Sequence, residues 1–109
     1  MFQDILAMGS GGGETIPEHY VVAPAANNAT GLVYHNDVRE VTWSYTVTGQ
    51  KYDDDNITVS NSGTAVTISF KKECTLYAGT SAAVTKAAGS SHAADFSQAA
   101  NYPALVIVN

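Results

Sequence analysis

Within residues 38–48, apolar and polar side chains alternate one by one from residue 40 onward. The apolar positions are Val41, Trp43, Tyr45 and Val47, and the other parity carries Glu40, Thr42, Ser44, Thr46 and Thr48. Successive side chains of a strand point to opposite faces, and β-branched and aromatic residues suit a pleated surface. The pattern predicts a half-buried antiparallel strand whose apolar positions face the core and which Gly49-Gln50 ends.

Shorter segments of similar character follow at short intervals. Residues 57–60 and 64–71 are expected to form a hairpin across Asn61-Ser62-Gly63, where glycine can adopt positive φ. The run Leu105–Val108 is apolar at every position, which suits a strand buried between two layers. Other expected strands are a short edge strand at 20–22, a strand at 74–78 with a turn at 79–81, and its return at 82–86.

These short strands with polar turns predict an all-β fold, a single small antiparallel β-sandwich or jelly-roll-like domain. A chain of 109 residues has room for one such domain, assigned to residues 14–109. Residues 14–28 read as loop. The alanine-rich stretch favours strand and loop, with a helical turn near 93–100 as the minor alternative.

The first thirteen residues have a different character from the rest. Phe2, Ile5, Leu6 and Met8 make an apolar peptide, and residues 9–13 read Gly-Ser-Gly-Gly-Gly, the composition of a flexible linker. Eight residues are too few to hold a helix in water alone. We therefore expect a flexible N-terminal arm, residues 1–13, that binds a partner surface on its own domain or on another subunit. The alternative is a frayed chain start.

Charge excludes several kinds of partner. The formal net charge is −5 and only 14% of residues are charged. An acidic surface repels phosphate backbones, so neither nucleic acid nor an anionic membrane surface is an expected partner. No stretch approaches the roughly 20 apolar residues of a membrane helix. The N-terminus carries Asp4 where a secretory signal has basic residues, so no secretory signal is expected.

Candidate chemical sites are few, and no metal or other cofactor is expected. The three histidines, at 19, 35 and 92, lack the close spacing of zinc ligands. The acidic run Asp53-Asp54-Asp55-Asn56 lacks the glycine and glutamate of a calcium loop and reads as a solvated turn, with calcium the alternative. No nucleophile elbow or phosphate loop occurs. The single cysteine, Cys74, lies in an alternating apolar run and is expected to be a buried thiol.

Aromatic residues raise a sugar-binding alternative. Trp43 and Tyr45 belong to the core-facing parity of the best strand, whereas Tyr52, Tyr77 and Tyr102 lie at loops or on polar parity. Exposed tyrosine rings can stack on sugars, so a host-surface glycan is a possible ligand.

The opening Met-Phe-Gln-Asp-Ile-Leu-Ala-Met-Gly-Ser-Gly-Gly-Gly resembles the start of small structural proteins from tailed bacteriophages. The course from Cys74-Thr75-Leu76-Tyr77 to Leu105–Val108 is similar to their compact β-domains. The resemblance implies a virion component of the tail, baseplate or head decoration, present in many copies and assembled in the host cytoplasm. It transfers no active-site residues.

The sequence therefore predicts a non-enzymatic assembly protein. Phe2, Ile5, Leu6 and Met8 are expected to contact another chain, either a copy of this protein or another virion protein. A glycan- or receptor-binding module at a fibre or cell surface is the main alternative. A small hydrolase accessory domain is the third.

Overall fold

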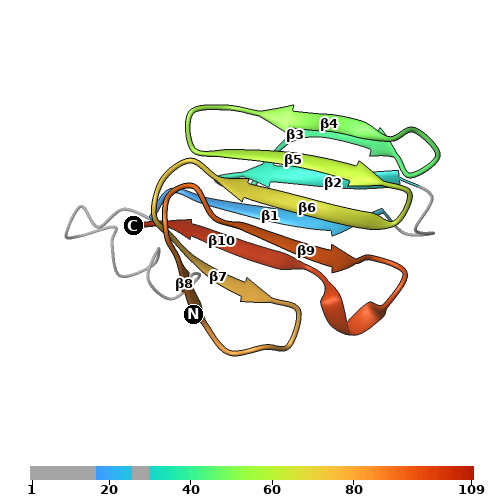
Figure 1. Cartoon of the computed structure of the whole chain (residues 1–109). Coiled ribbons are helices and arrows are strands. Elements are labelled where there is room, and N and C mark those ends of the chain that lie inside the picture. Colours follow the sequence, from blue (N-terminus) through green and yellow to red (C-terminus); the bar gives the residue numbers. More distant parts are fainter. Residues whose placement is uncertain (1–16, 26–29) are drawn as a thin grey trace.

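The computed structural model describes residues 17–25 and 30–109, which form two antiparallel β-sheets packed face to face (Figure 1). The strands of sheet A are, in spatial order, β3 (Val38–Ser44), β2 (Thr30–His35), β1 (His19–Pro24), β10 (Ala104–Val108), β7 (Cys74–Ala78) and β8 (Val84–Lys86). Those of sheet B are β4 (Gly49–Asp53), β5 (Ile57–Ser62), β6 (Ala65–Phe70) and β9 (Ser91–Asp95). The predicted all-β sandwich is confirmed.

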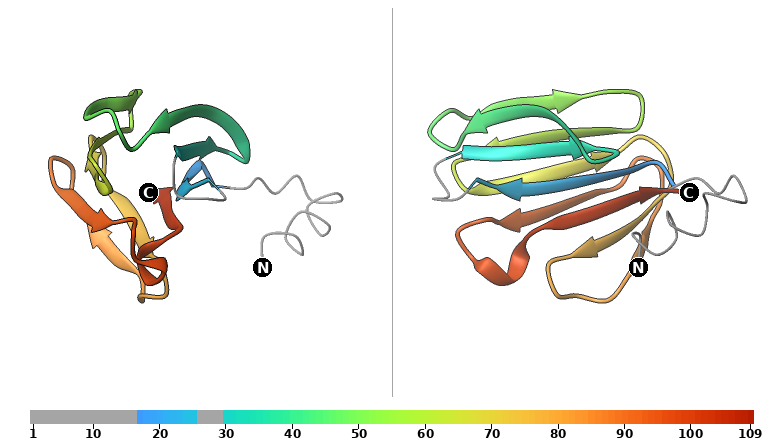
Figure 2. Two further views of the ribbon diagram at one scale, coloured as in Figure 1. Left: turned by 90° about the vertical axis from the view of Figure 1, so that its right-hand side faces the viewer. Right: turned by 180° about the vertical axis from the view of Figure 1, so that it is seen from behind.

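The chain builds the sheets mainly from consecutive antiparallel neighbours. The strands β1, β2 and β3 follow one another in sheet A, and β4, β5 and β6 do so in sheet B after the chain crosses at residues 45–48. The last strand, β10, then inserts between β1 and β7 and pairs with both. It thereby joins the first three strands of sheet A to its other two, and the end-on view in Figure 2 shows the two resulting layers.

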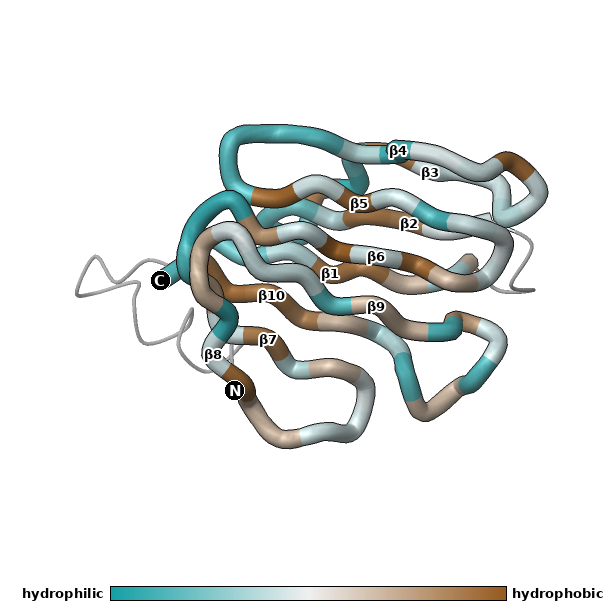
Figure 3. Tube along the Cα trace, in the orientation of Figure 1, coloured by the Kyte–Doolittle hydropathy of each residue, from teal (hydrophilic) through white to brown (hydrophobic). Residues whose placement is uncertain are grey.

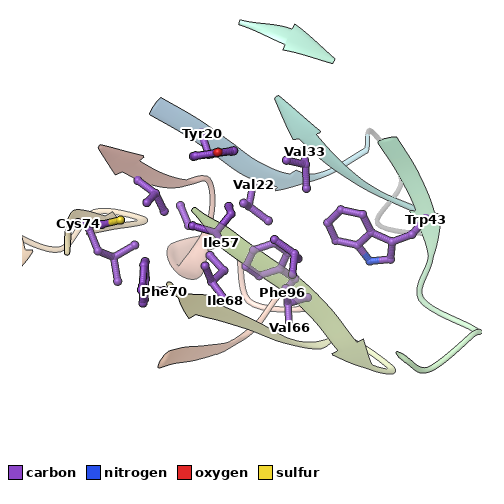
Figure 4. Packing of buried hydrophobic residues seen from close by; sticks show 14 of the residues in the cluster. Tyr20, Val22, Val33, Trp43, Ile57, Val66, Ile68, Phe70, Cys74 and Phe96 are labelled. Carbon is purple, nitrogen blue, oxygen red and sulfur yellow. The ribbon is translucent and has the colours of Figure 1, made fainter. Parts of the chain in front are cut away.

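The core lies between the sheets and is made by the alternate side chains of their inner faces. Figure 4 shows this layer with Cys74 near one end and Trp43 at the other. Buried apolar residues come from both sheets: Tyr20, Val22, Val33, Trp43, Leu76 and Val106 from sheet A, and Ile57, Val59, Val66, Ile68 and Phe70 from sheet B. Cys74 is fully buried, which confirms its expected structural environment.

The strand predicted at 38–48 is shorter than expected. It ends at Ser44, where the Val47 N–H donates to the Ser44 carbonyl and turns the chain toward sheet B. Trp43 and Tyr45 are buried as predicted, but Val47 is 54% exposed because it lies in this crossing segment. Gly49 does not end the strand. It begins β4, an element that the sequence interpretation missed.

Three further expectations are corrected. The segment 20–22 belongs to β1, which is an interior strand between β2 and β10 and not an edge. Residues 14–28, expected as loop, contain that strand. Strand β2, which pairs with β1 and β3, was not expected either. By contrast, the alanine-rich stretch contains the strand β9 and, beyond a short loop, the 3₁₀ turn η1 (Ala99–Asn101), in line with the strand-and-loop expectation and its helical-turn alternative.

The C-terminal run is a central strand of sheet A, but it is not buried on both faces. Ala104 and Val106 point into the core and are fully buried, whereas Leu105 and Ile107 point outward and are partly exposed. Figure 3 shows β10 hydrophobic along most of its length. An apolar run therefore marks here a strand with one face in the core and the other at the surface.

Candidate functional site

The residues predicted for assembly, Phe2, Ile5, Leu6 and Met8, lie outside the described residues. So do the glycine run at 9–13 and the proposed boundary between residues 13 and 14. The surfaces and side-chain clusters below belong to the described part of the chain.

The main polar cluster of the domain centres on Asp54, in the loop between β4 and β5. Its Oδ1 accepts hydrogen bonds from the backbone N–H groups of Asn56, at 2.8 Å, and Ile57, at 3.0 Å. Its Oδ2 accepts from the hydroxyls of Tyr52, at 2.8 Å, and Tyr20. Tyr20 comes from sheet A, whereas Tyr52 and Ile57 come from sheet B, so the carboxylate ties the two sheets together.

Asn56 extends this cluster toward the start of β1. Its Nδ2 donates to the Tyr20 hydroxyl, at 2.8 Å, and to Glu18 Oε2, at 3.0 Å. His35 Nε2 lies 2.9 Å from the same Glu18 oxygen, and its ring stacks on Tyr20 with centroids 4.3 Å apart. We call Glu18, Tyr20, Tyr52, Asp54 and Asn56 the Asp54 network.

Environment sets the protonation of these groups. Burial raises the pKa of Asp54, but hydrogen bonds from Tyr20, the loop backbone and Tyr52 outweigh it and leave the pKa below its ordinary value. Burial and the bond to Asp54 raise the pKa of both Tyr20 and Tyr52. At neutral pH the Asp54 carboxylate is held by two neutral phenols, an arrangement that suits a structural tie.

The acidic run is therefore not the solvated turn that the sequence suggested. Asp54 is partly buried and Asn56 is 5% exposed, while Asp53 bonds Lys71 and Thr58 outside the core. Among the described residues, no group of three or more His, Cys, Asp or Glu side chains is placed to hold a metal ion. The four hydrogen bonds to Asp54 use the lone pairs that a calcium ion would need.

The opposite end of the sandwich carries polar atoms without such bonds. Among the described residues, Trp43 Nε1, Tyr45 Oη and Asn61 Oδ1 are buried and have no hydrogen-bond partner. In the Asp54 network the one such atom is Asn56 Oδ1. The Trp43 ring lies over Gly31 of the neighbouring strand, where a Cβ atom would collide with it. Burial raises the pKa of Tyr45 to about 12, and nearby Tyr102 adds to the shift. Aromatic packing dominates this end, and hydrogen bonding dominates the other.

The outward face of sheet A carries a continuous row of apolar side chains. In register, Tyr34 of β2 lies opposite Val21 of β1, Val21 opposite Leu105 of β10, and Leu105 opposite Tyr77 of β7. All four alternate with core residues on their strands, so they point away from sheet B. We call these four residues the apolar row; Leu32, Ala23 and Ile107 lie beside it on the same face.

The outward face of sheet B has the opposite chemistry. One cross-strand row reads Asp53, Thr58, Ser69 and Ser91, and the next reads Gln50, Ser60, Thr67 and Ala93. We call these two the hydroxyl rows. Serine and threonine side chains keep their hydroxyls in water, so this is the face expected of a sheet surrounded by solvent.

Only one of the three tyrosines considered for sugar binding is exposed. Tyr77 is 38% exposed and belongs to the apolar row. Tyr52 packs against the core and bonds Asp54, and Tyr102 packs against Phe96. The three histidines belong to no metal-holding group in the described part of the chain: His19 contacts Pro17 and Asp37, His35 bonds Glu18, and His92 lies in β9.

Sequence reasoning missed both the Asp54 network and the apolar row. Tyr20 and Asp54 are 34 residues apart, and no local spacing announces their contact. The apolar row draws one residue from each of four strands. Its one visible signal was the apolar run at 105–108, whose outward positions had been assigned to a second buried face.

In comparisons with protein-family models, with curated proteins and with solved structures, no match to this chain was found. Within residues 17–25 and 30–109, no helix is long and apolar enough to cross a membrane. Function must therefore be argued from the two outward faces and the Asp54 network.

Proposed function

We propose that the chain is a non-enzymatic assembly subunit, a structural component of a tailed-bacteriophage particle assembled in the host cytoplasm. It packs against copies of itself and other particle proteins through its N-terminal arm. The observation that carries the proposal is the apolar row on the outward face of sheet A. The opening peptide, which resembles the start of such phage proteins, supports the choice of particle.

The apolar row favours a covered surface. Antiparallel sheets with one face in water usually carry polar residues there, as sheet B does. A contiguous outward apolar patch is typical of a protein contact. A subunit with one apolar and one hydroxyl-rich face packs on one side only, which suits ordered assembly from repeated copies.

The Asp54 network supports a structural role for the main carboxylate cluster. A general base needs a free lone pair directed at substrate, and a phenolate nucleophile needs a lowered pKa. The oxygens of Asp54 are occupied by hydrogen bonds, and the tyrosine pKa values are raised. The cluster is therefore better suited to fixing the two sheets than to turnover.

The experiment is sedimentation equilibrium of the full chain, whose monomer mass is 11.4 kDa. We expect a wild-type mass that is a multiple of this value and that rises with concentration. Replacing Phe2, Ile5 and Leu6 together by serine should return the mass to the monomer, with circular dichroism unchanged. Gln3→Ser, in the same segment, is the matched control. A wild-type chain that stays monomeric, or a triple variant that assembles normally, would contradict the proposal.

The second candidate is a glycan-binding module, favoured by the exposed ring of Tyr77. Binding on a glycan array that disappears in Tyr77→Ala but persists in the arm variant would select it. Tyr102→Phe is the control, because that ring packs against the core.

A further inference from the structure

We infer that the outward face of sheet A, centred on the apolar row, is the surface that receives residues 1–8 of a neighbouring copy. The inference rests on the proposed function and names the receiving surface, which that function leaves open. It is carried by the register of four paired strands and by the place where the described chain begins.

The chemistry and dimensions of the two partners match. The apolar row places Val21 and Leu105 between two tyrosine rings, and the arm offers Phe2, Ile5 and Leu6. Four strands span about 15 Å, at roughly 4.8 Å between neighbours. Residues 2–8 reach at most about 25 Å when extended, so they are long enough to cross the whole row. Contact removes apolar surface of both partners from water.

The described chain begins beside this face. The described chain starts at Pro17, and Glu18 accepts a hydrogen bond from the Val108 N–H, so the start of β1 is fixed against β10. These are the two middle strands of the apolar row. Residues 9–16 can span at most about 28 Å, and their glycines let the chain leave in any direction.

The proposed function selects a neighbour's arm over the chain's own. If the arm folded back on its own sheet A, neither the arm nor the apolar row would remain for another subunit. Exchange between copies uses both, since each copy donates one arm and offers one face. Sheet B is the poorer receiver, because an apolar arm over the hydroxyl rows would bury serine and threonine hydroxyls without partners.

The test uses two full-length variants that carry different tags. The donor is Leu6→Cys and the receiver is Leu105→Cys; the matched control receiver is Thr67→Cys, which places the new thiol on the outward face of sheet B. The native Cys74 is fully buried and stays out of the reaction. After mixing and mild oxidation, we expect a disulfide-linked pair of the two chains, with a yield about tenfold that of the Thr67→Cys control.

A yield no higher than that of the Thr67→Cys control overturns the inference. So does a double variant, Leu6→Cys with Leu105→Cys, that forms its disulfide only within one chain. If Leu105→Cys fails to fold, Tyr77→Cys serves as the receiver, because that side chain lies at the exposed end of the row. Arm-dependent assembly in the serine test together with equal cross-linking of both faces would leave the proposed function standing and reject this receiving surface.

Discussion

On the outward face of each sheet, one row of side chains runs across four paired strands, and the two rows differ in chemistry. In sheet A the four strands place Tyr34, Val21, Leu105 and Tyr77 side by side. In sheet B the corresponding row is polar throughout: Asp53, Thr58, Ser69 and Ser91. Both sheets share the same core and the same antiparallel pairing, so neither backbone geometry nor the demands of the interior explain the difference.

The contrast teaches that the outward faces meet different surroundings. The inner positions must be apolar in any sandwich, but the outer positions are free to be polar, and in sheet B they are. An outer face that remains apolar has its composition set by what covers it.

The largest difference in folding stability is expected between two aspartate substitutions, one on the inner and one on the outer face of β10. Val106→Asp puts an unpaired charge into the core and should cost more than about 4 kcal/mol, which prevents folding. Leu105→Asp, one residue away, reaches water and should cost about 1 kcal/mol, mainly through strand propensity. Circular dichroism with thermal unfolding measures both. Similar losses in the two variants would show that β10 is buried on both faces.

A smaller effect is expected where the two sheets are tied together. Asp54→Asn keeps the shape of the side chain but weakens two bonds from tyrosines and two from the backbone. We expect a loss of about 2 to 3 kcal/mol in the free energy of unfolding, measured with urea. A cost below about 0.5 kcal/mol would mean that the network does not hold the sheets in place.

Lowering the pH should remove the contribution of the Asp54 carboxylate to the stability of the fold. The pKa of Asp54 is lower in the folded chain than in the unfolded chain. Its contribution to the free energy of unfolding is therefore fully present above the pKa of the unfolded chain, near pH 4, and is lost as the pH falls through the lower pKa of the folded chain. The stability gap between wild type and Asp54→Asn should therefore narrow below about pH 4. Association through an apolar row has no carboxylate to titrate and should persist. A gap that widens in acid would reverse the assigned sign.

The two ends of the sandwich allow a matched tyrosine pair. Tyr20→Phe removes a hydroxyl with two partners and should cost about 1 to 2 kcal/mol. Tyr45→Phe removes one with no partner and should stay within about 0.5 kcal/mol of wild type or be slightly stabilising. Chemical unfolding measures the free energy of unfolding of both variants. Equal losses would contradict the conclusion that hydrogen bonding dominates the Tyr20 end and aromatic packing the Tyr45 end.

The smallest change in stability is expected from making sheet B resemble sheet A. Ser60→Val with Thr67→Leu replaces the centre of one hydroxyl row, at about 1 kcal/mol or less in folding free energy. We expect the variant to associate at lower concentrations than wild type, as measured by light scattering. Ser60→Thr with Thr67→Ser is the control. No gain in association would mean that an outward apolar row alone does not drive contact.

Period-two patterns predicted β5 and β6, whose outer face is polar. Ile57, Val59, Val66 and Ile68 alternate with serine and threonine, so both strands and their pairing could be placed from the sequence, although the turn falls at residues 63–64 and not at 61–63. The pattern was less informative for β2 and β10 of sheet A. Leu105 and Ile107 made β10 appear apolar throughout, and the residues of β2 show little alternation because Leu32 and Tyr34 face outward as apolar residues.

The candidate surfaces were less predictable than the fold. The Asp54 network joins two separate segments, residues 18–20 and 52–56. The apolar row needs the register of four strands, with β10 inserted between β1 and β7. Loop composition suggested a solvated turn at 53–56, because sequence alone gives no means of bringing Tyr20 to Asp54. The expected contacts of Phe2, Ile5, Leu6 and Met8 lie outside the described residues and stay a prediction.

The most direct measurement is sedimentation equilibrium of wild type and Leu105→Thr side by side, with thermal unfolding as the check on folding. The substitution introduces threonine, a β-branched residue that suits a strand, and changes only the middle of the outward row. If that row forms the assembly contact, the dissociation constant rises about tenfold or more while the domain stays folded. An unchanged dissociation constant in a folded Leu105→Thr chain would contradict the claim that the apolar row forms the assembly contact.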